Sequence, residues 1–105
     1  MPVKDVSSVE EFRGFKSDAK LCCVDFYAHW CGPCRMMKAA VEELSSKYPQ
    51  VAFVRVNVED MSELSDLEGV TAMPTFVFYK NSKRLDEFTG ASAATLEATL
   101  LKLTS

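Results

Sequence analysis

The clearest pattern in the sequence is an almost unbroken apolar run over residues 21–28, LCCVDFYA. The run is rich in residues that favour strands, and a strand that is covered on both faces of a sheet has this composition. We therefore predict a central β-strand here. Asp25 is the single charged residue within the run, so this position requires a separate explanation.

Two helices are predicted in the first half of the chain. The sequence SSVE matches a capping box in which Ser7 is the cap and Glu10 reaches back, and apolar residues follow it at helical spacing. In residues 34–48 the apolar positions recur three and four residues apart, with polar residues between them. Pro49 ends this second helix, and a C-x-x-C pair lies at its start.

The remaining segments continue an alternation of short strands and helices. Serine tolerates a positive φ poorly, which weakens the prediction of a tight turn at Asn81 and Ser82. The resulting order, βαβαβαββα, predicts an α/β fold whose mixed sheet is parallel through its crossovers and antiparallel at the last hairpin, with helices on both faces. The predicted segments are a strand at 51–58, a short helix at 61–68 that Gly69 ends, strands at 75–79 and 85–89, and a last helix that Ser92 caps.

Length and charge narrow the possible functions. The 105 residues, 48% of them apolar, suit a single domain over residues 1–105. Twelve basic and 15 acidic residues give a net charge of −3 without a basic cluster, so neither nucleic acid nor a membrane surface is expected as a partner. The first residues lack a secretory leader pattern, so we expect a cytoplasmic protein whose four cysteines are kept in a reducing environment.

The C-x-x-C pair, Cys31 and Cys34, is compatible with several kinds of chemistry. Structural zinc would need two further ligands, but Cys22 and Cys23 belong to the buried strand and His29 lies too close along the chain. Covalent haem attachment would need a histidine directly after the second cysteine, where this chain has arginine. No metal is therefore expected.

A redox pair explains more of the surrounding residues. Trp30 and Pro33 would shape a tight turn, and Gly32 would leave one side open for the backbone of a partner. Cys31 is predicted to be the exposed sulfur at the start of the helix, where the helix dipole contributes only about 0.3 to 1 kcal/mol. A larger lowering of its pKa would need a hydrogen bond, which we expect from the thiol of Cys34, the resolving cysteine.

Asp25 fits the same chemistry. Burial in a central strand raises the pKa of a carboxyl group towards neutrality, where the group can exchange a proton with a thiol. Its place six residues before Cys31 puts it beneath the motif. The alternative is a structural carboxylate that a buried lysine or strand-end amides satisfy.

Several of these residues occur in one known family. The runs VDFYAHWCGPC, VRVNVE and GVTAMPTFVFYKN, followed by Gly90, resemble thioredoxins in order and spacing across nearly the whole chain. The resemblance implies the thioredoxin fold, with a mixed sheet of about five strands and about four helices. It also implies a general protein disulfide reductase that binds no cofactor and is reset by an NADPH-dependent thioredoxin reductase. Peroxiredoxin, ribonucleotide reductase and methionine sulfoxide reductase would receive its electrons, and a redox disulfide would join Cys31 to Cys34.

The resemblance also implies a docking surface. It assigns Pro74 as a cis-proline that faces the cysteines, with the backbone of Met73 pairing with a bound substrate strand. Such a surface would let partners dock through backbone pairing and shape. The apolar patch around Cys31 would consist of Trp30, Gly32, Pro33, Met73, Pro74, Gly90 and Ala91.

Some questions stay open at this point. His29 and Arg35 flank the motif and either tune the thiolate of Cys31 or face water. Cys22 and Cys23 are either inert core residues or regulatory thiols that support a disulfide-linked dimer of a mainly monomeric protein. A disulfide isomerase or oxidase, and a binding module of the same fold without catalysis, are the alternative functions.

Overall fold

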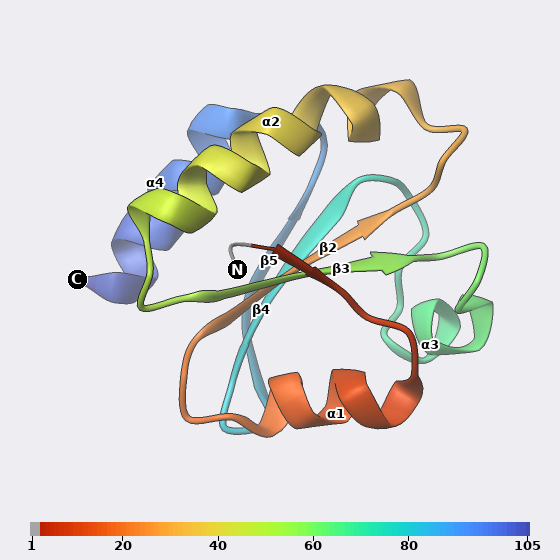
Figure 1. Cartoon of the computed structure of the whole chain (residues 1–105), viewed down its shortest axis with the longest axis horizontal. Coiled ribbons are helices and arrows are strands. Elements are labelled where there is room, and N and C mark those ends of the chain that lie inside the picture. The colour runs from red at the N-terminus through yellow and green to blue at the C-terminus, as the bar shows by residue number, and fades with distance from the viewer. Residues whose placement is uncertain (1–2) are drawn as a thin grey trace.

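The predicted strands assemble into one five-stranded mixed sheet in the computed structural model, which describes residues 3–105. The three strands of the first half run parallel, and the last two are antiparallel to their neighbours. The strand order is β1 (Val3–Asp5), β3 (Ala52–Asn57), β2 (Cys22–Tyr27), β4 (Thr75–Lys80) and β5 (Lys83–Thr89) (Figure 1). The expected order of elements and the central position of residues 22–27 are confirmed.

Helices cover both faces of this sheet, as the element order predicted. Figure 1 shows α2 and α4 together on one side of the strands and α1 on the opposite side. The helices are α1 (Val9–Ser17), α2 (Gly32–Lys47), α3 (Ser62–Leu67) and α4 (Ala93–Thr104). None of the described helices is long and apolar enough to cross a membrane.

The alternation of side chains along β2 divides the interior into two cores. Cys23 packs with the apolar residues of α2 and α4, whereas Cys22, Val24 and Phe26 pack with Phe12 of α1 and with residues of α3. A strand that supplies both cores must be apolar at nearly every position, which explains the composition of residues 21–28. Asp25 and Cys23 are two residues apart, so Asp25 lies on the α2 side of the sheet.

The capping box at the first helix is displaced by one residue from its predicted position. The N-cap is Ser8, not Ser7, and its hydroxyl accepts a hydrogen bond from the backbone N–H of Glu11. The carboxylate of Glu11, not Glu10, reaches back and accepts from the backbone N–H of Ser7 at 2.8 Å. This register places Phe12 fully inside the core, and core packing determines which serine caps the helix.

The last hairpin forms despite the serine in its turn. Asn81 and Ser82 both have positive φ, 53° and 69°, as a two-residue hairpin loop with the right twist requires. Their backbone N–H groups donate to the carbonyls of Asp18 and Lys16, which close the end of α1. These two hydrogen bonds hold Ser82 in a conformation that its side chain disfavours, and β5 therefore begins at Lys83 instead of at residue 85.

Candidate active site

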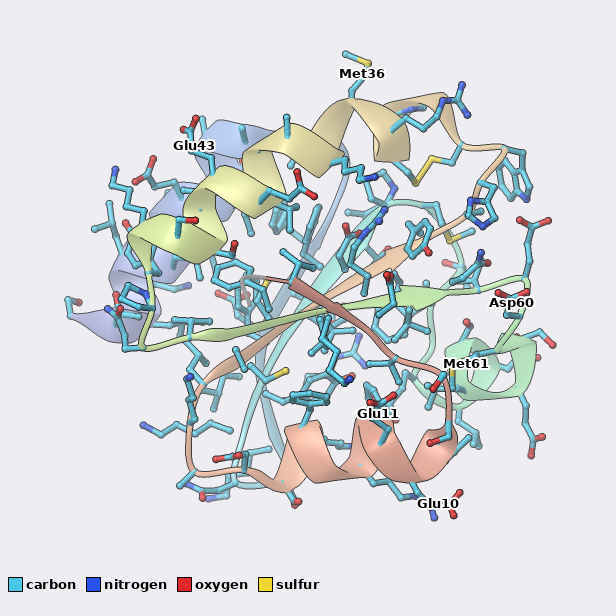
Figure 2. All side chains as sticks on the ribbon, viewed as in Figure 1. Glu10, Glu11, Met36, Glu43, Asp60 and Met61 are labelled. Atoms are coloured by element: carbon cyan, nitrogen blue, oxygen red, sulfur yellow. A yellow bond between two sulfur atoms is a disulfide. The ribbon has the colours of Figure 1, made fainter. Side chains whose placement is uncertain are left out.

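A disulfide joins Cys31 and Cys34 at the start of α2, with their Cα atoms 5.2 Å apart. Figure 2 shows it as a yellow bond beside the first turn of the helix, from which Met36 points outward. Cys31 is the N-cap of α2, and Pro33 occupies the first turn, where proline has the φ that a helix needs and loses no hydrogen bond. The C-G-P-C sequence thus folds into a tight turn that continues directly as a helix.

The sulfur of Cys31 receives a hydrogen bond from the protein backbone. Its Sγ accepts from the backbone N–H of Cys34 at 3.1 Å, in the way that an N-cap oxygen accepts in other helices. The predicted donor was the Cys34 thiol, but in the disulfide form this thiol hydrogen is absent. A helix N-terminus and a donated hydrogen bond both favour negative charge on this sulfur.

The prediction that Cys31 has an exposed sulfur is wrong for the disulfide form. Cys31 is only 4% exposed and Cys34 only 1%, because the pair packs with Ala28 and is covered by neighbouring apolar side chains. Trp30, by contrast, is 64% exposed. The side chains that cover the pair are Tyr27, Val58 and Met73.

The segment around Met73 is brought to the cysteines from a distant part of the chain. The Met73–Pro74 peptide bond is cis, as the resemblance implied, and Met73 packs against the cysteine pair. The carbonyl of Pro74 accepts a hydrogen bond from the N–H of Gly90 at 2.9 Å, and Gly90 has a φ of 119° that favours glycine. Pro74 is buried, whereas Ala91 is exposed next to Gly90.

Asp25 is buried beneath this region, with one charged neighbour that the sequence analysis missed. It pairs in register with Arg55 of the neighbouring parallel strand, and its Oδ2 lies 3.5 Å from Nε of Arg55. The guanidinium in turn lies over the ring of Tyr27, 3.8 Å from its centroid. Arg55 is the only charged residue in β3, and this isolation is the one signal in the sequence that marks it.

The surroundings of Asp25 determine its protonation. Burial raises the pKa of this carboxyl from 3.8 to about 6, and the positive charge of Arg55 limits the rise. Neither carboxylate oxygen accepts a hydrogen bond from residues 3–105, so neither the buried lysine nor the strand-end amides of the structural alternative are present. A carboxyl group with this pKa changes its charge near neutral pH and can exchange a proton there.

His29 and Arg35, which flank the motif, are joined by a hydrogen bond. Nη1 of Arg35 donates a hydrogen bond to the backbone carbonyl of His29 at 2.7 Å. The His29 ring meets the ring of Tyr27 edge to face, with centroids 5.7 Å apart. Both flanking side chains are exposed, and whether they tune Cys31 stays a prediction.

Cys22 and Cys23 are fully buried and unpaired, on opposite faces of β2. Burial raises the pKa of Cys22 to about 12 and that of Cys23 well above its usual value. The thiolate is the reactive form of cysteine, so both thiols are unreactive where they lie. Within residues 3–105, no group of three or more histidine, cysteine or acidic side chains could hold a metal ion.

Comparison with known proteins agrees with this geometry. The thioredoxin family model matches residues 4–102. The chain belongs to the thioredoxin family. It is 42% identical to thioredoxin-1 of Schizosaccharomyces pombe over 98 residues, which are 93% of this chain and 95% of that protein.

Solved thioredoxin structures have the same fold. The crystal structure of thioredoxin from Trypanosoma brucei brucei superposes with a TM-score of 0.94 at 33% identity, covering 97% of this chain and 90% of that one. A second structure, from work on the thiol resolving mechanism in yeast mitochondrial 1-Cys peroxiredoxin via glutathione/thioredoxin systems, gives a TM-score of 0.90 at 33% identity and covers 95% and 94%.

Membership of the family establishes the reaction class. Thioredoxins are thiol-disulfide oxidoreductases that act on disulfides of other proteins and need no bound cofactor, and the Cys31–Cys34 disulfide is a redox pair of this type. The protein is a thiol-disulfide oxidoreductase with disulfide reductase function.

Proposed function

We propose that this chain, a single thioredoxin domain over residues 1–105, is a general protein disulfide reductase. Cys31 is its nucleophile, Cys34 its resolving cysteine and Asp25 the group that handles the proton. The observation that carries the proposal is the Cys31–Cys34 disulfide at the start of α2, with the Cys31 sulfur as the helix N-cap. A thiolate in that place is favoured by both the helix dipole and the N–H of Cys34.

The reaction runs in two exchanges that begin from the reduced protein. The Cys31 thiolate attacks one sulfur of a target disulfide, forms a mixed disulfide and releases the other target sulfur as a thiolate. The Cys34 thiolate then attacks the Cys31 sulfur, which forms the Cys31–Cys34 disulfide and releases the second target thiolate. The target gains two electrons and the protein loses two.

The second exchange requires Cys34 to lose its proton. We assign this proton to the carboxylate of Asp25, which lies on the side of the sheet that α2 covers. Its pKa of about 6 leaves most of the group ionised at pH 7, yet basic enough to accept a proton. Arg55 stabilises the ionised form from 3.5 Å away.

The docking surface consists of the residues that surround Cys31. Trp30 and Met36 present exposed apolar side chains. Met73 packs against the cysteine pair, and we propose that its backbone pairs with an extended target segment. A side chain at Gly32 would meet only Arg35, at 3.9 Å, so the surface over Gly32 is open. Pro33, Gly90 and Ala91 complete the proposed surface, whereas Pro74 is buried and adjoins this surface through Met73.

Family membership supports a proposal for the source of electrons and for the partners. We propose recycling by an NADPH-dependent thioredoxin reductase, and peroxiredoxin, ribonucleotide reductase and methionine sulfoxide reductase as substrates. The structural relative from the yeast 1-Cys peroxiredoxin work supports the first of these substrates. We place the protein in the cytoplasm, where it would maintain redox homeostasis as an electron carrier and mainly as a monomer.

One assay tests the mechanism. NADPH consumption is followed with a thioredoxin reductase and a protein disulfide substrate, for the wild type, Cys31→Ser and Cys34→Ser. Loss of activity in both variants is expected, with a mixed disulfide accumulating only in Cys34→Ser, because that variant attacks but cannot resolve. Turnover in Cys31→Ser would overturn the assignment of the nucleophile.

The same variants separate the alternative functions. A binding module without catalysis would keep its cellular role when both Cys31 and Cys34 are replaced by serine. An isomerase or oxidase would reactivate scrambled or reduced substrates faster than it reduces native disulfides. Pro33 between the cysteines favours the reductase over these two enzymes.

A further inference from the structure

A small cavity lies beside the active site, on the α2 side of the sheet. This cavity of about 260 Å³ opens between the start of α2 and the C-terminal ends of β2 and β3. A water molecule has about 30 Å³ in the liquid, so the cavity has room for a small ion with part of its hydration shell. Its lining residues are Tyr27, Ala28, His29, Cys34, Arg35, Lys38 and Arg55.

The charges on this lining are of one sign. Arg35, Lys38 and Arg55 are cationic, and no carboxylate belongs to the lining. Within residues 3–105 neither Arg35 nor Lys38 forms an ion pair, and Arg55 has only Asp25 behind it. The lining thus carries three cationic side chains and no anionic one, in a protein whose net charge is −3.

Two of the three cations are held in place before any ligand arrives. The ring of Tyr27 stacks on the guanidinium of Arg55, whose Nε makes no hydrogen bond to the described part of the chain. The guanidinium of Arg35 is anchored through Nη1 to the carbonyl of His29. A fixed guanidinium loses little entropy on binding, and its planar donors match the oxygens of an oxyanion.

We propose that this cavity is a binding site for a small free dianion of the oxyanion class, of which sulfate and phosphate are the simplest members. The charge balance selects the dianion: Asp25 offsets one of the three cations, which leaves two positive charges for the ligand. Lys38 completes the site from the exposed face of α2.

Occupancy of the cavity is coupled to the buried acid. Asp25 faces Arg55 and, at longer range, Asp5, and only Arg55 favours its ionised form. An anion on the far side of Arg55 adds a negative charge near Asp25 and disfavours its ionisation. By linkage, protonation of Asp25 strengthens anion binding by the same factor.

The test is a titration of the oxidised, 15N-labelled protein at pH 7, with sodium sulfate replacing sodium chloride at constant ionic strength. We expect saturable shifts of the amide and Nε–H resonances of Arg35 and Arg55. Lys38→Gln is expected to weaken the affinity about fivefold, as the loss of one exposed charge pair does. Lys80→Gln, the same charge change on an exposed residue outside the cavity, is the control and is expected to leave the affinity unchanged.

Three outcomes would overturn the proposal: shifts that stay linear with sulfate, an equal weakening by Lys80→Gln, or acetate binding as tightly as sulfate. Thermal melts of both variants confirm that they fold. As a second readout, sulfate is expected to raise the midpoint of the Asp25 carboxyl titration in the wild type, and less so in Lys38→Gln. The oxidised protein is measured throughout, so the result does not depend on the proposed reductase mechanism.

Discussion

Asp25 is the residue at which folding and the proposed chemistry place opposite demands on one side chain. The folded-state pKa of about 6 lies above the ordinary value of 3.8, so between these pH values the folded protein binds more protons than the unfolded chain. The contribution of Asp25 to the free energy of unfolding therefore falls as the pH rises from about 4 to about 6, and it stays constant above about pH 6. The protein retains a carboxylate that destabilises it at neutral pH, as groups at functional sites often do.

Asp25→Asn is accordingly expected to stabilise the protein at pH 8 and to leave its stability nearly unchanged at pH 3.5. The difference between the two pKa values corresponds to about 3 kcal/mol, an upper bound because Arg55 loses its partner. Urea unfolding at both pH values measures the effect, and an equal change at both would contradict it. The same variant is expected to reduce protein disulfides more slowly at pH 7, so unchanged turnover would remove Asp25 from the mechanism.

At the scale of single residues, the sequence predicted the site well where its residues are neighbours along the chain. Cys31, Cys34 and Pro33 form one turn, so the chemistry followed from their spacing. Arg55 reaches Asp25 only through the register of β2 and β3, two parallel strands in which these residues lie 30 positions apart in the sequence. The predicted exposure of Cys31 was wrong because Val58 and Met73, which cover it, come from segments far away in the sequence.

At the scale of elements, the type and order of helices and strands followed from hydrophobic periodicity, whereas their ends did not. Both Ser7 with Glu10 and Ser8 with Glu11 have the spacing of a capping box. The choice depends on which rotation of α1 buries Phe12 against β2 and β4, through contacts with Phe26 and Tyr79. The turn at residues 81–82 likewise depends on hydrogen bonds that its N–H groups donate to carbonyls at the end of α1, far away in the sequence.

The cap at α1 gives an expectation that separates the two serines. Ser8→Ala removes the acceptor for the N–H of Glu11 and is expected to lower the free energy of unfolding by about 1 kcal/mol. Ser7→Ala is the matched control: it removes only the long, exposed hydrogen bond from the Ser7 hydroxyl to Oε1 of Glu11 at 3.3 Å, whereas the Ser7 backbone N–H that donates to Glu11 survives the substitution. Urea denaturation followed by circular dichroism measures both free energies of unfolding. A larger loss for Ser7→Ala would indicate that Ser7 is the cap, as the sequence predicted.

At the scale of the whole molecule, β2 is the element that joins all parts of the structure. It pairs with β3 on one side and β4 on the other, and its side chains enter both cores. Cys22 and Cys23 begin this strand and are 0% and 1% exposed. Exposing either thiol therefore requires the sheet to separate from its helices, which amounts to global unfolding.

Alkylation of Cys22 and Cys23 in the oxidised protein is thus expected to report global stability. With Cys31 and Cys34 protected as a disulfide, iodoacetamide should label both residues slowly, at equal rates that rise with urea in step with the unfolded fraction. Ser8→Ala should label about fivefold faster than the wild type, since about 1 kcal/mol of lost stability increases the unfolded population by that factor. Mass spectrometry of the labelled peptides gives both rates. Rapid labelling of one residue under native conditions would contradict the inert-core assignment and would make that thiol a candidate for a disulfide-linked dimer.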